Sequence, residues 1–219
     1  MKQLIDRLEQ EQTLPREDWI RLLEDFTPED TAYLCERARH VRQMHYQNRI
    51  FIRGLIEFTN YCKNDCFYCG IRRSNCNTHR YRLSKATILD CCRRGYELGF
   101  RTFVLQGGED GHFTDAVLTD IVHAIRTEFP DCAITLSIGE RSRDSYQQLF
   151  DAGANRFLLR HETFDSTHYA SLHPAGLTAA SRQKCLWNLK EIGYQVGSGF
   201  MVGSPGQTTE NLADDLLFT

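Results

Sequence analysis

The chain has 219 residues, 41% of them hydrophobic, and a formal net charge of −3. A chain of this length can bury a substantial core within one domain, and its small net charge does not favour a nucleic acid or an anionic membrane as partner. No apolar stretch is long enough to cross a bilayer and the charged first twelve residues lack a signal sequence, so we expect a cytoplasmic protein.

The cysteine count also limits the class of protein. The chain contains nine cysteines, an odd number. In a chain without an export signal, this number indicates metal or redox use more than a disulfide framework.

The first part of the chain predicts helices. Leucines recur at helical spacing in residues 1–47, and Thr27 followed by Pro28 is a typical helix start with Thr27 as the N-cap. We therefore expect a helical extension over residues 1–47, followed by a core domain over residues 48–219.

From residue 50 onward, short apolar runs alternate with amphipathic stretches. The pattern predicts strands over 50–58, 102–105, 133–138, 156–159 and 195–202, with helices over 84–98, 114–128, 142–152, 178–192 and from 207. Strands that alternate with helices form a parallel sheet, so the fold class is α/β. Five units fall short of the eight in a closed barrel, and we expect an incomplete barrel, either a fragment or a chain completed by a partner.

Each predicted strand ends in a polar or glycine-rich segment. The carboxyl ends of parallel strands share one edge of a sheet, which is where ligands bind in such folds. The segments at this edge are Cys62–Cys69, Gln106–Glu109, Ser137–Glu140, Arg160–Glu162 and Gly203–Gln207.

The cysteine segment has the spacing C-x3-C-x2-C, formed by Cys62, Cys66 and Cys69. Three thiolates can hold three irons of a [4Fe–4S] cluster and leave the fourth iron open to a small molecule. A structural zinc site is the alternative, with Cys76 or His79 as a fourth ligand. A disulfide with a spare thiol is disfavoured by the expected compartment. Four other cysteines, Cys35, Cys91, Cys92 and Cys185, fall within predicted helices and are expected to be structural or incidental.

The turn after the second strand contains Gly107, Gly108 and Glu109. Two glycines allow a ligand to approach the backbone closely, and the carboxylate of Glu109 can accept a hydrogen bond from an ammonium group. A Gly-Gly turn alone is usually only a turn, but its position at the expected ligand edge favours a binding role.

Two charged segments complete the predicted site. Arg160 and Glu162 follow the fourth strand, where they either form a salt bridge between strand and helix or contact a ligand. Arg182 lies in the first turns of the next helix, where its guanidinium either clamps a ligand carboxylate or is solvated.

These motifs together resemble the radical S-adenosylmethionine (SAM) superfamily, and within it the HydE-type [FeFe]-hydrogenase maturases. The resemblance rests on the cysteine spacing with Tyr68 and on four runs: Arg53–Asn60, Val104–Asp110, Leu159–Thr163 and Met201–Thr208. The family fold is a TIM-like (β/α) barrel, in agreement with the predicted units.

The resemblance implies a chemistry and a set of site residues. Cys62, Cys66 and Cys69 hold a [4Fe–4S] cluster, and SAM chelates the open iron and is cleaved reductively to methionine and a 5′-deoxyadenosyl radical. The implied cofactor contacts are Gly107, Gly108, Glu109, Glu162, Arg182 and Met201, the last near the adenine. Ser137 lies on the substrate side, and Arg160 is a further substrate candidate.

The resemblance also implies a substrate and partners, and three other functions are alternatives to it. The implied substrate is a small or organometallic molecule, an iron carbonyl–cyanide precursor of the hydrogenase active site, and the implied partners are an electron donor such as a flavodoxin or ferredoxin and other maturases. Methylornithine synthase shares the fold and most motifs. Biotin synthase is disfavoured because a second cluster needs further strand-end cysteines. A zinc-stabilised binding module is the alternative from another class.

Overall fold

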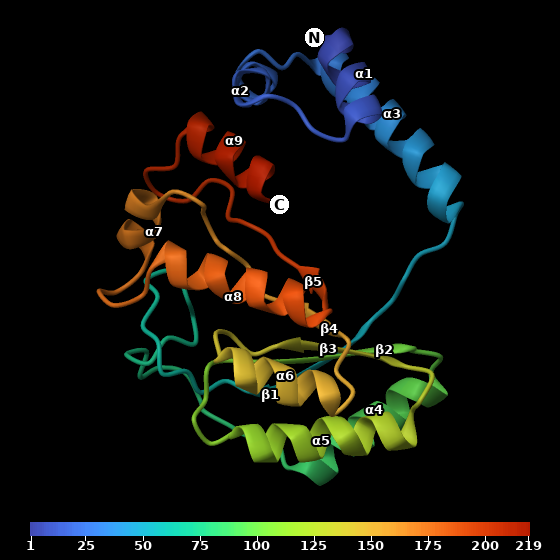
Figure 1. Cartoon of the computed structure of the whole chain (residues 1–219), viewed down its shortest axis with the longest axis vertical. Helices are drawn as coiled ribbons and strands as arrows, with labels where there is room; N and C mark the ends of the chain where they lie inside the picture. The colour runs from blue at the N-terminus through green and yellow to red at the C-terminus, as the bar shows by residue number, and fades with distance from the viewer. The chain divides into compact units, whose positions relative to one another are not determined.

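A computed structural model describes residues 1–219, which form two compact units. The sheet unit comprises Ile52–Glu162 and Tyr169–Gly199, and the helical unit comprises Met1–Phe51, Thr163–His168 and Phe200–Thr219 (Figure 1). Each unit is described by itself below.

The sheet unit contains five strands in the order in which they occur along the chain. They are β1 (Gly54–Thr59), β2 (Thr102–Gly107), β3 (Ala133–Ser137), β4 (Arg156–Leu158) and β5 (Gln195–Gly197). Every neighbouring pair is parallel, so the predicted parallel α/β sheet is confirmed.

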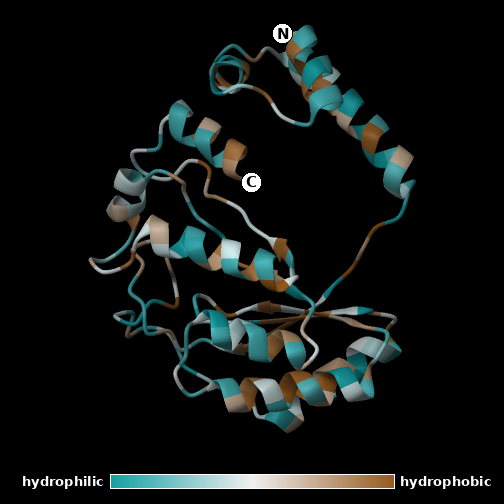
Figure 2. Ribbon diagram, in the orientation of Figure 1, coloured by the Kyte–Doolittle hydropathy of each residue, from teal (hydrophilic) through white to brown (hydrophobic).

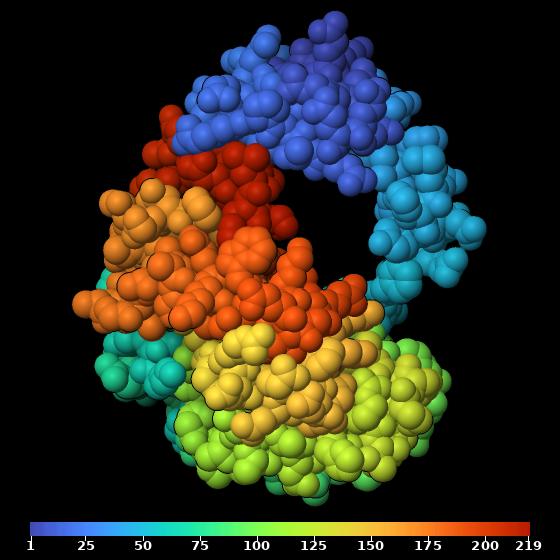
Figure 3. Space-filling view, in the orientation of Figure 1, coloured from blue at the N-terminus to red at the C-terminus, as the bar shows by residue number.

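Helices connect these strands. They are α4 (Lys85–Glu97), α5 (Asp115–Glu128), α6 (Arg143–Asp151) and α8 (Ala179–Ile192). Since parallel crossovers are right-handed and the sheet grows in one direction, successive helices fall on the same side of the sheet. They pack in sequence, α4 against α5, α5 against α6, and α6 against α8, and Figure 3 shows the orange atoms of α8 directly against the yellow atoms of α6.

The core of this unit lies between the strands and the helices. Hydrophobic residues mark the strands and one side of α5 in Figure 2. Phe103 and Leu105 of β2, Ile134 of β3 and Val122 of α5 are each at most 1% exposed. Burial of several such side chains, each worth about 1.5–3 kcal/mol, fixes the strands and therefore the edge at which they end.

The four helices begin where the sequence supplies a cap. The side chains of Ser84, Thr114, Ser142 and Thr178 each accept a hydrogen bond from the backbone N–H three residues later. Such a cap satisfies one of the free N–H groups of the first turn. The polar residues that end each strand–helix loop thus also determine where each helix begins.

The helical unit contains α1 (Lys2–Glu11), α2 (Arg16–Glu24), α3 (Pro28–Tyr46) and α9 (Thr209–Phe218). Ile5, Leu14 and Leu22 form its buried cluster, and Arg16 joins α2 to α9 by two hydrogen bonds to Asp214, at 2.6 and 3.1 Å. The predicted start of α3 is confirmed, with Thr27 in a capping box and Pro28 in the first turn. None of the helices of the chain combines the length and the apolar character that a membrane span requires.

Three predicted features differ from the structure. β1 begins at Gly54 rather than at residue 50, and Ile50 and Phe51 are exposed. β5 ends at Gly197. The seven-residue helix α7 (Ser166–Leu172) was not predicted, because it is too short to show a helical pattern. The sequence marks its start only by Asp165, which accepts a hydrogen bond from the His168 amide at 2.7 Å. Cys35 lies within α3, in agreement with its predicted place in a helix, and is exposed.

Candidate functional site

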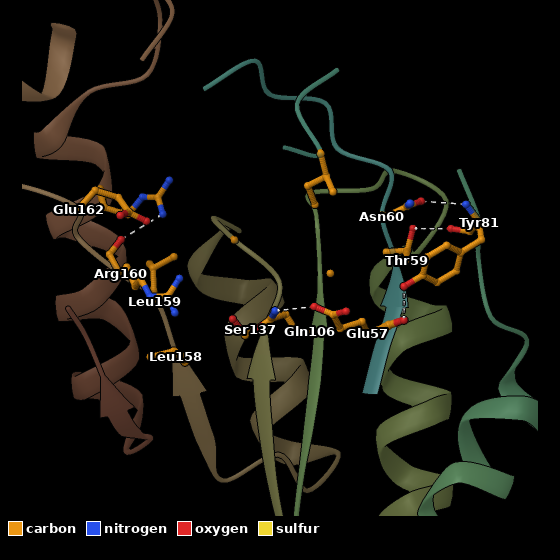
Figure 4. Close-up of a pocket in the computed structure, with 14 residues that line it drawn as sticks. Glu57, Thr59, Asn60, Tyr81, Gln106, Ser137, Leu158, Leu159, Arg160 and Glu162 are labelled. Carbon is orange, nitrogen blue, oxygen red and sulfur yellow. Dashed lines mark hydrogen bonds between the residues drawn. The ribbon is translucent and has the colours of Figure 1, made fainter. Parts of the chain in front are cut away.

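A cavity of about 250 Å³ lies at the carboxyl edge of the sheet. Five predicted site residues line it: Gly107, Ser137, Arg160, Glu162 and Arg182. Figure 4 shows Arg160 and Glu162 on one side of this cavity and Asn60 and Tyr81 on the other. The topology therefore brings together polar residues that are up to 125 positions apart in the chain, roughly the span from the first strand to α8.

Glu57 and Gln106 are two of the lining residues that were not predicted as site residues. Glu57 of β1 and Gln106 of β2 are paired in register, and the Gln106 amide donates to the Glu57 carboxylate at 3.2 Å (Figure 4). A signal for Glu57 exists in the sequence, because it is a carboxylate in the middle of the apolar run Leu55–Phe58. A charged residue inside a strand usually faces water or a ligand.

The three motif cysteines lie in the loop after β1. All three are free thiols of intermediate burial. The Cys69 amide donates to the Cys66 carbonyl at 3.0 Å, so a tight turn connects the last two. Burial raises the pKa of the Cys66 thiol to about 11; Arg182 opposes this rise, and Cys62 and Cys69 add to it. The three sulfurs and the Arg182 guanidinium are therefore close enough to share one electrostatic environment.

Arg80 organises this loop from within. Its guanidinium donates to the carbonyls of Ile71 at 2.9 Å, Arg72 at 2.7 Å and Asn75 at 3.2 Å, and also to the carbonyl of Asn60. One planar group with five donors can bind several carbonyls at once, which a lysine ammonium cannot do in the same geometry. The sequence motif alone gave no indication of this role.

An ion pair between Arg82 and Asp110 holds the end of the loop. Arg82 donates to both carboxylate oxygens of Asp110, at 2.6 and 2.9 Å, and lies 3.8 Å from the centre of the Tyr61 ring. Asp110 also accepts from the Thr59 hydroxyl at 2.8 Å. The cysteine loop is thus attached to the turn that follows β2.

The end of β1 and the start of the cysteine loop pack so closely against the turn after β2 that only glycine fits at positions 107 and 108. A Cβ on Gly108 would overlap the Tyr61 carbonyl oxygen and lie 2.7 Å from the Cβ of Cys62, and a Cβ on Gly107 would lie 2.7 Å from Thr59 Cγ2. No side chain fits at these distances. The close approach that the two glycines permit is that of the cysteine loop itself.

Glu109 lies in a second cavity rather than in the first. This cavity, of about 370 Å³, is lined among others by Lys63, Glu109, Glu140 and Arg141. The Glu109 carboxylate is 9% exposed, pairs with the Lys63 ammonium at 3.1 Å and accepts from the Glu140 amide at 3.0 Å. Gly139, at φ +76°, leaves room for it, since a Cβ there would lie 2.6 Å from Glu109 Cδ. Glu109 therefore lines a different cavity from the other predicted residues, although Glu140 links it to Arg182.

Arg182 is buried and paired, so the solvated alternative is wrong. Its side chain is 9% exposed, and its Nε donates to Glu140 Oε1 at 2.7 Å. A second nitrogen donates to the Arg160 carbonyl at 3.2 Å. Burial lowers the pKa of the guanidinium, but its interactions with the Tyr169 phenol and with the carboxylates of Glu140 and Glu109 outweigh burial and raise the pKa, which keeps Arg182 a cation.

Glu162 has a rare backbone conformation and a buried carboxyl group. Its φ of +67° lies in the left-handed region, which a non-glycine residue rarely adopts, and its amide donates to the Gly199 carbonyl at 3.1 Å. Burial raises the pKa of its carboxyl group, while Arg182 and Arg160 oppose the rise. Backbone strain and a perturbed pKa often occur together at functional sites.

Tyr68 connects the cysteine loop to a histidine. His173 Nδ1 lies 2.8 Å from the Tyr169 carbonyl, which only accepts, so Nδ1 carries the proton and Nε2 accepts from the Tyr68 hydroxyl at 3.0 Å. The His173 ring stacks on the Tyr169 ring at 3.8 Å. Burial lowers the pKa of His173, which favours this neutral tautomer.

The remaining predicted residues lie elsewhere. Met201 belongs to the helical unit, where its carbonyl accepts from the Gln207 amide at 2.6 Å, so its predicted place near an adenine stays a prediction. Cys76, the proposed fourth zinc ligand, is exposed with its sulfur 3.9 Å from Asn77 Oδ1. No group of three or more His, Cys, Asp or Glu side chains converges on a single ion.

The comparison with known families identifies the class of protein. Residues 56–219 match the model of the radical SAM superfamily, and the chain belongs to that superfamily. The family uses a [4Fe–4S] cluster and SAM.

Two curated relatives are similar to this chain in sequence over most of its length. The chain is 43% identical over 185 residues to the [FeFe] hydrogenase maturase subunit HydE of Thermotoga maritima, covering 84% of this chain and 52% of that protein. It is 30% identical over 192 residues to the 3-methylornithine synthase of Methanosarcina acetivorans, covering 87% and 54%. The chain therefore spans about half the length of these curated relatives.

Solved structures agree on the fold. The crystal structure of methylornithine synthase matches with a TM-score of 0.86 at 28% identity, over 97% of this chain and 62% of that chain. The hydrogenase maturase HydG matches with a TM-score of 0.86 at 21% identity, over 99% and 49%, and so supports the fold alone. The predicted relation to the barrel-type radical SAM enzymes is confirmed.

The residues present suit the family's cluster. Each thiolate of such a cluster binds its own iron, so the sulfurs need not converge on one point as the ligands of a single ion do. Three half-buried thiols on one loop, next to a buried cation, provide the required number and type of donors.

Proposed function

We propose that Cys62, Cys66 and Cys69 hold a [4Fe–4S] cluster at which SAM is cleaved reductively. The observation that carries this proposal is that three free, half-buried thiols share the loop that follows β1, at the carboxyl edge of the sheet. When bound, the cluster supplies the electron for cleavage of the sulfonium C–S bond.

The other site residues bind and orient the ligand. Arg182 carries a permanent positive charge next to the cavity and suits a ligand carboxylate, while Glu140 fixes the direction of its guanidinium. Glu162 and the Gly107–Glu109 turn supply acceptors suited to an ammonium group, with Glu162 on the cavity wall. Ser137 and Arg160 line the same cavity and are our candidates for substrate contacts, and Met201 for the adenine.

For the whole protein we propose a maturase role in [FeFe]-hydrogenase active-site assembly. The support is the 43% identity to HydE over 84% of the chain. The substrate would then be a small organometallic iron compound, and a flavodoxin or ferredoxin would be the electron donor, with other maturases as partners. We assign the core to residues 48–219 and the helical extension to residues 1–47.

The cluster proposal is tested by anaerobic reconstitution with iron and sulfide. We expect a brown protein that forms 5′-deoxyadenosine from SAM after reduction. Cys66→Ala abolishes both colour and product, whereas Cys76→Ala, the matched control at an exposed thiol, leaves both unchanged. A colourless protein with one tightly bound zinc contradicts the proposal.

A second candidate is a methylornithine synthase-like mutase. Its support is the 30% identity and the TM-score of 0.86 to such enzymes. Restoration of hydrogenase activity in a strain that lacks its HydE favours the maturase. Formation of 3-methylornithine by the reconstituted protein favours the mutase.

A further inference from the structure

The loop that contains the cysteines has a charge unlike that of the rest of the chain. Between Asn60 and Leu83 it contains five cationic side chains and a single carboxylate, in a chain whose net charge is −3. The cations are Lys63, Arg72, Arg73, Arg80 and Arg82, and the carboxylate is Asp65.

Two of these cations act inside the protein. Arg80 donates to backbone carbonyls of the loop, and Arg82 pairs with Asp110. The remaining three are Lys63, Arg72 and Arg73. Arg72 is half-buried, and its guanidinium donates one hydrogen bond to the Cys69 carbonyl at 3.2 Å. Arg73 is exposed, and no side-chain hydrogen bond or salt bridge holds it.

The carboxylates near these three cations do not cancel the surface charge. The Glu109 partner of Lys63 is 9% exposed, whereas the Lys63 side chain is 66% exposed, so the ammonium is the group that faces solvent. Asp65 accepts from the Ser74 amide at 3.0 Å, and this hydrogen bond lowers the pKa of its carboxyl group. It therefore offsets one charge of the patch.

An exposed aromatic side chain lies among these charges. Phe67, between Cys66 and Tyr68, is 60% exposed, and Tyr68 is 43% exposed. The Phe67 amide donates to the Leu172 carbonyl at 3.0 Å, which fixes the backbone from which the ring projects. Exposed aromatics with a charged rim are typical of protein interfaces.

We propose that this surface, defined by Lys63, Phe67, Arg72 and Arg73, is the docking site of an acidic one-electron carrier protein. The proposal rests on the proposed function, because reductive cleavage of SAM needs an electron from outside. The carrier is oxidised by one electron and the cluster is reduced by one, and docking itself forms and breaks no covalent bond. Opposite charges speed such encounters, and the effect weakens as salt screens them.

The first test measures binding alone. A bacterial flavodoxin serves as the probe, and its Kd for the full chain is measured by calorimetry at low and high salt. We expect Arg73→Glu to raise Kd about fivefold at low salt and Phe67→Ala about tenfold. Arg94→Glu is the matched control, because it makes the same charge change on a side chain of α4 that is 76% exposed. Arg94 lines a cavity with Gly54 and Leu55 at the start of β1, whereas the cysteine loop follows the end of β1. We expect no change in Kd for this variant.

The second test separates this proposal from the proposed function. With reduced flavodoxin, Arg73→Glu should raise the flavodoxin concentration that gives half-maximal formation of 5′-deoxyadenosine, while the rate with reduced methyl viologen stays the same. Absence of product with both reductants refutes the proposed function, and the binding result still decides the docking site.

Two outcomes overturn the docking proposal. One is a Kd that neither salt, Arg73→Glu nor Phe67→Ala changes. The other is a self-associated chain that Phe67→Ala converts to monomers, without any change in flavodoxin binding, which would assign the surface to a second copy of the chain.

Discussion

Gly108 provides a quantitative test of how the cysteine loop is positioned. In Gly108→Ala the new Cβ would lie 2.7 Å from Cys62 Cβ and closer still to the Tyr61 carbonyl oxygen. Ordinary carbon–carbon contact begins at about 3.5 Å, so Cys62 must retreat by roughly 0.8 Å. Overpacking of this kind costs about 1–3 kcal/mol, and it shifts one of the three proposed iron ligands.

The assay combines stability with iron content. We expect Gly108→Ala to lose about 2 kcal/mol in urea denaturation and to bind less iron and sulfide per chain after anaerobic reconstitution. Gly111→Ala is the control in the same segment, because a Cβ there meets nothing within 4 Å. If the two variants behave alike in both measurements, the close approach does not position the loop and the reasoning is wrong.

Three further predictions concern the charged residues around the loop. Burial opposes the charge of Asp110, but hydrogen bonds from Arg82, the His112 amide and Thr59 prevail and lower its pKa to about 2 from 3.8. The ionised Asp110 carboxylate therefore stabilises the fold above about pH 4, and this stabilisation is lost as the pH falls toward 2. Asp110→Asn should remove roughly 2 kcal/mol from the loss of unfolding free energy at acid pH, measured by urea titrations. An unchanged pH profile contradicts the ion pair. Arg80→Lys should cost about 2 kcal/mol in the same assay, since an ammonium cannot reach all of the carbonyls, and wild-type stability would rule out its organising role. Arg182→Lys keeps the charge but loses the planar group that binds Glu140 through one nitrogen and the Arg160 carbonyl through another. Calorimetry should therefore show SAM binding at least about tenfold weaker with cluster content retained, and equal affinity would exclude the carboxylate clamp.

Local patterns were sufficient to predict most of the fold. The predicted strand 102–105 and helix 114–128 correspond to Thr102–Gly107 and Asp115–Glu128, because hydrophobic periodicity and helix caps are both local properties of the sequence. The extra residues predicted before β1 illustrate the limit. Ile50 and Phe51 are apolar but exposed, and an apolar run alone does not reveal whether another strand is there to pair with it.

The site was predictable only in outline. Ser137, Glu162 and Arg182 line one cavity, as their positions at the carboxyl edge of the sheet predicted. These positions did not predict that Glu109 would face a separate cavity, since that depends on a hydrogen bond to the Glu140 amide and on the space left by Gly139. Nor could they predict Arg80, because its partners are backbone carbonyls, which leave no trace in the sequence.

The contacts of Arg80 and Arg82 set a lower limit on the part of this protein that can be transplanted. The cysteine motif ends at Cys69, yet Arg80 fixes the loop from eleven positions further on, and Arg82 ties it to Asp110. A graft of the eight-residue motif onto another parallel sheet would therefore lack its internal support. A graft from Asn60 to Arg82, placed beside a turn with an aspartate and two glycines, would carry that support with it.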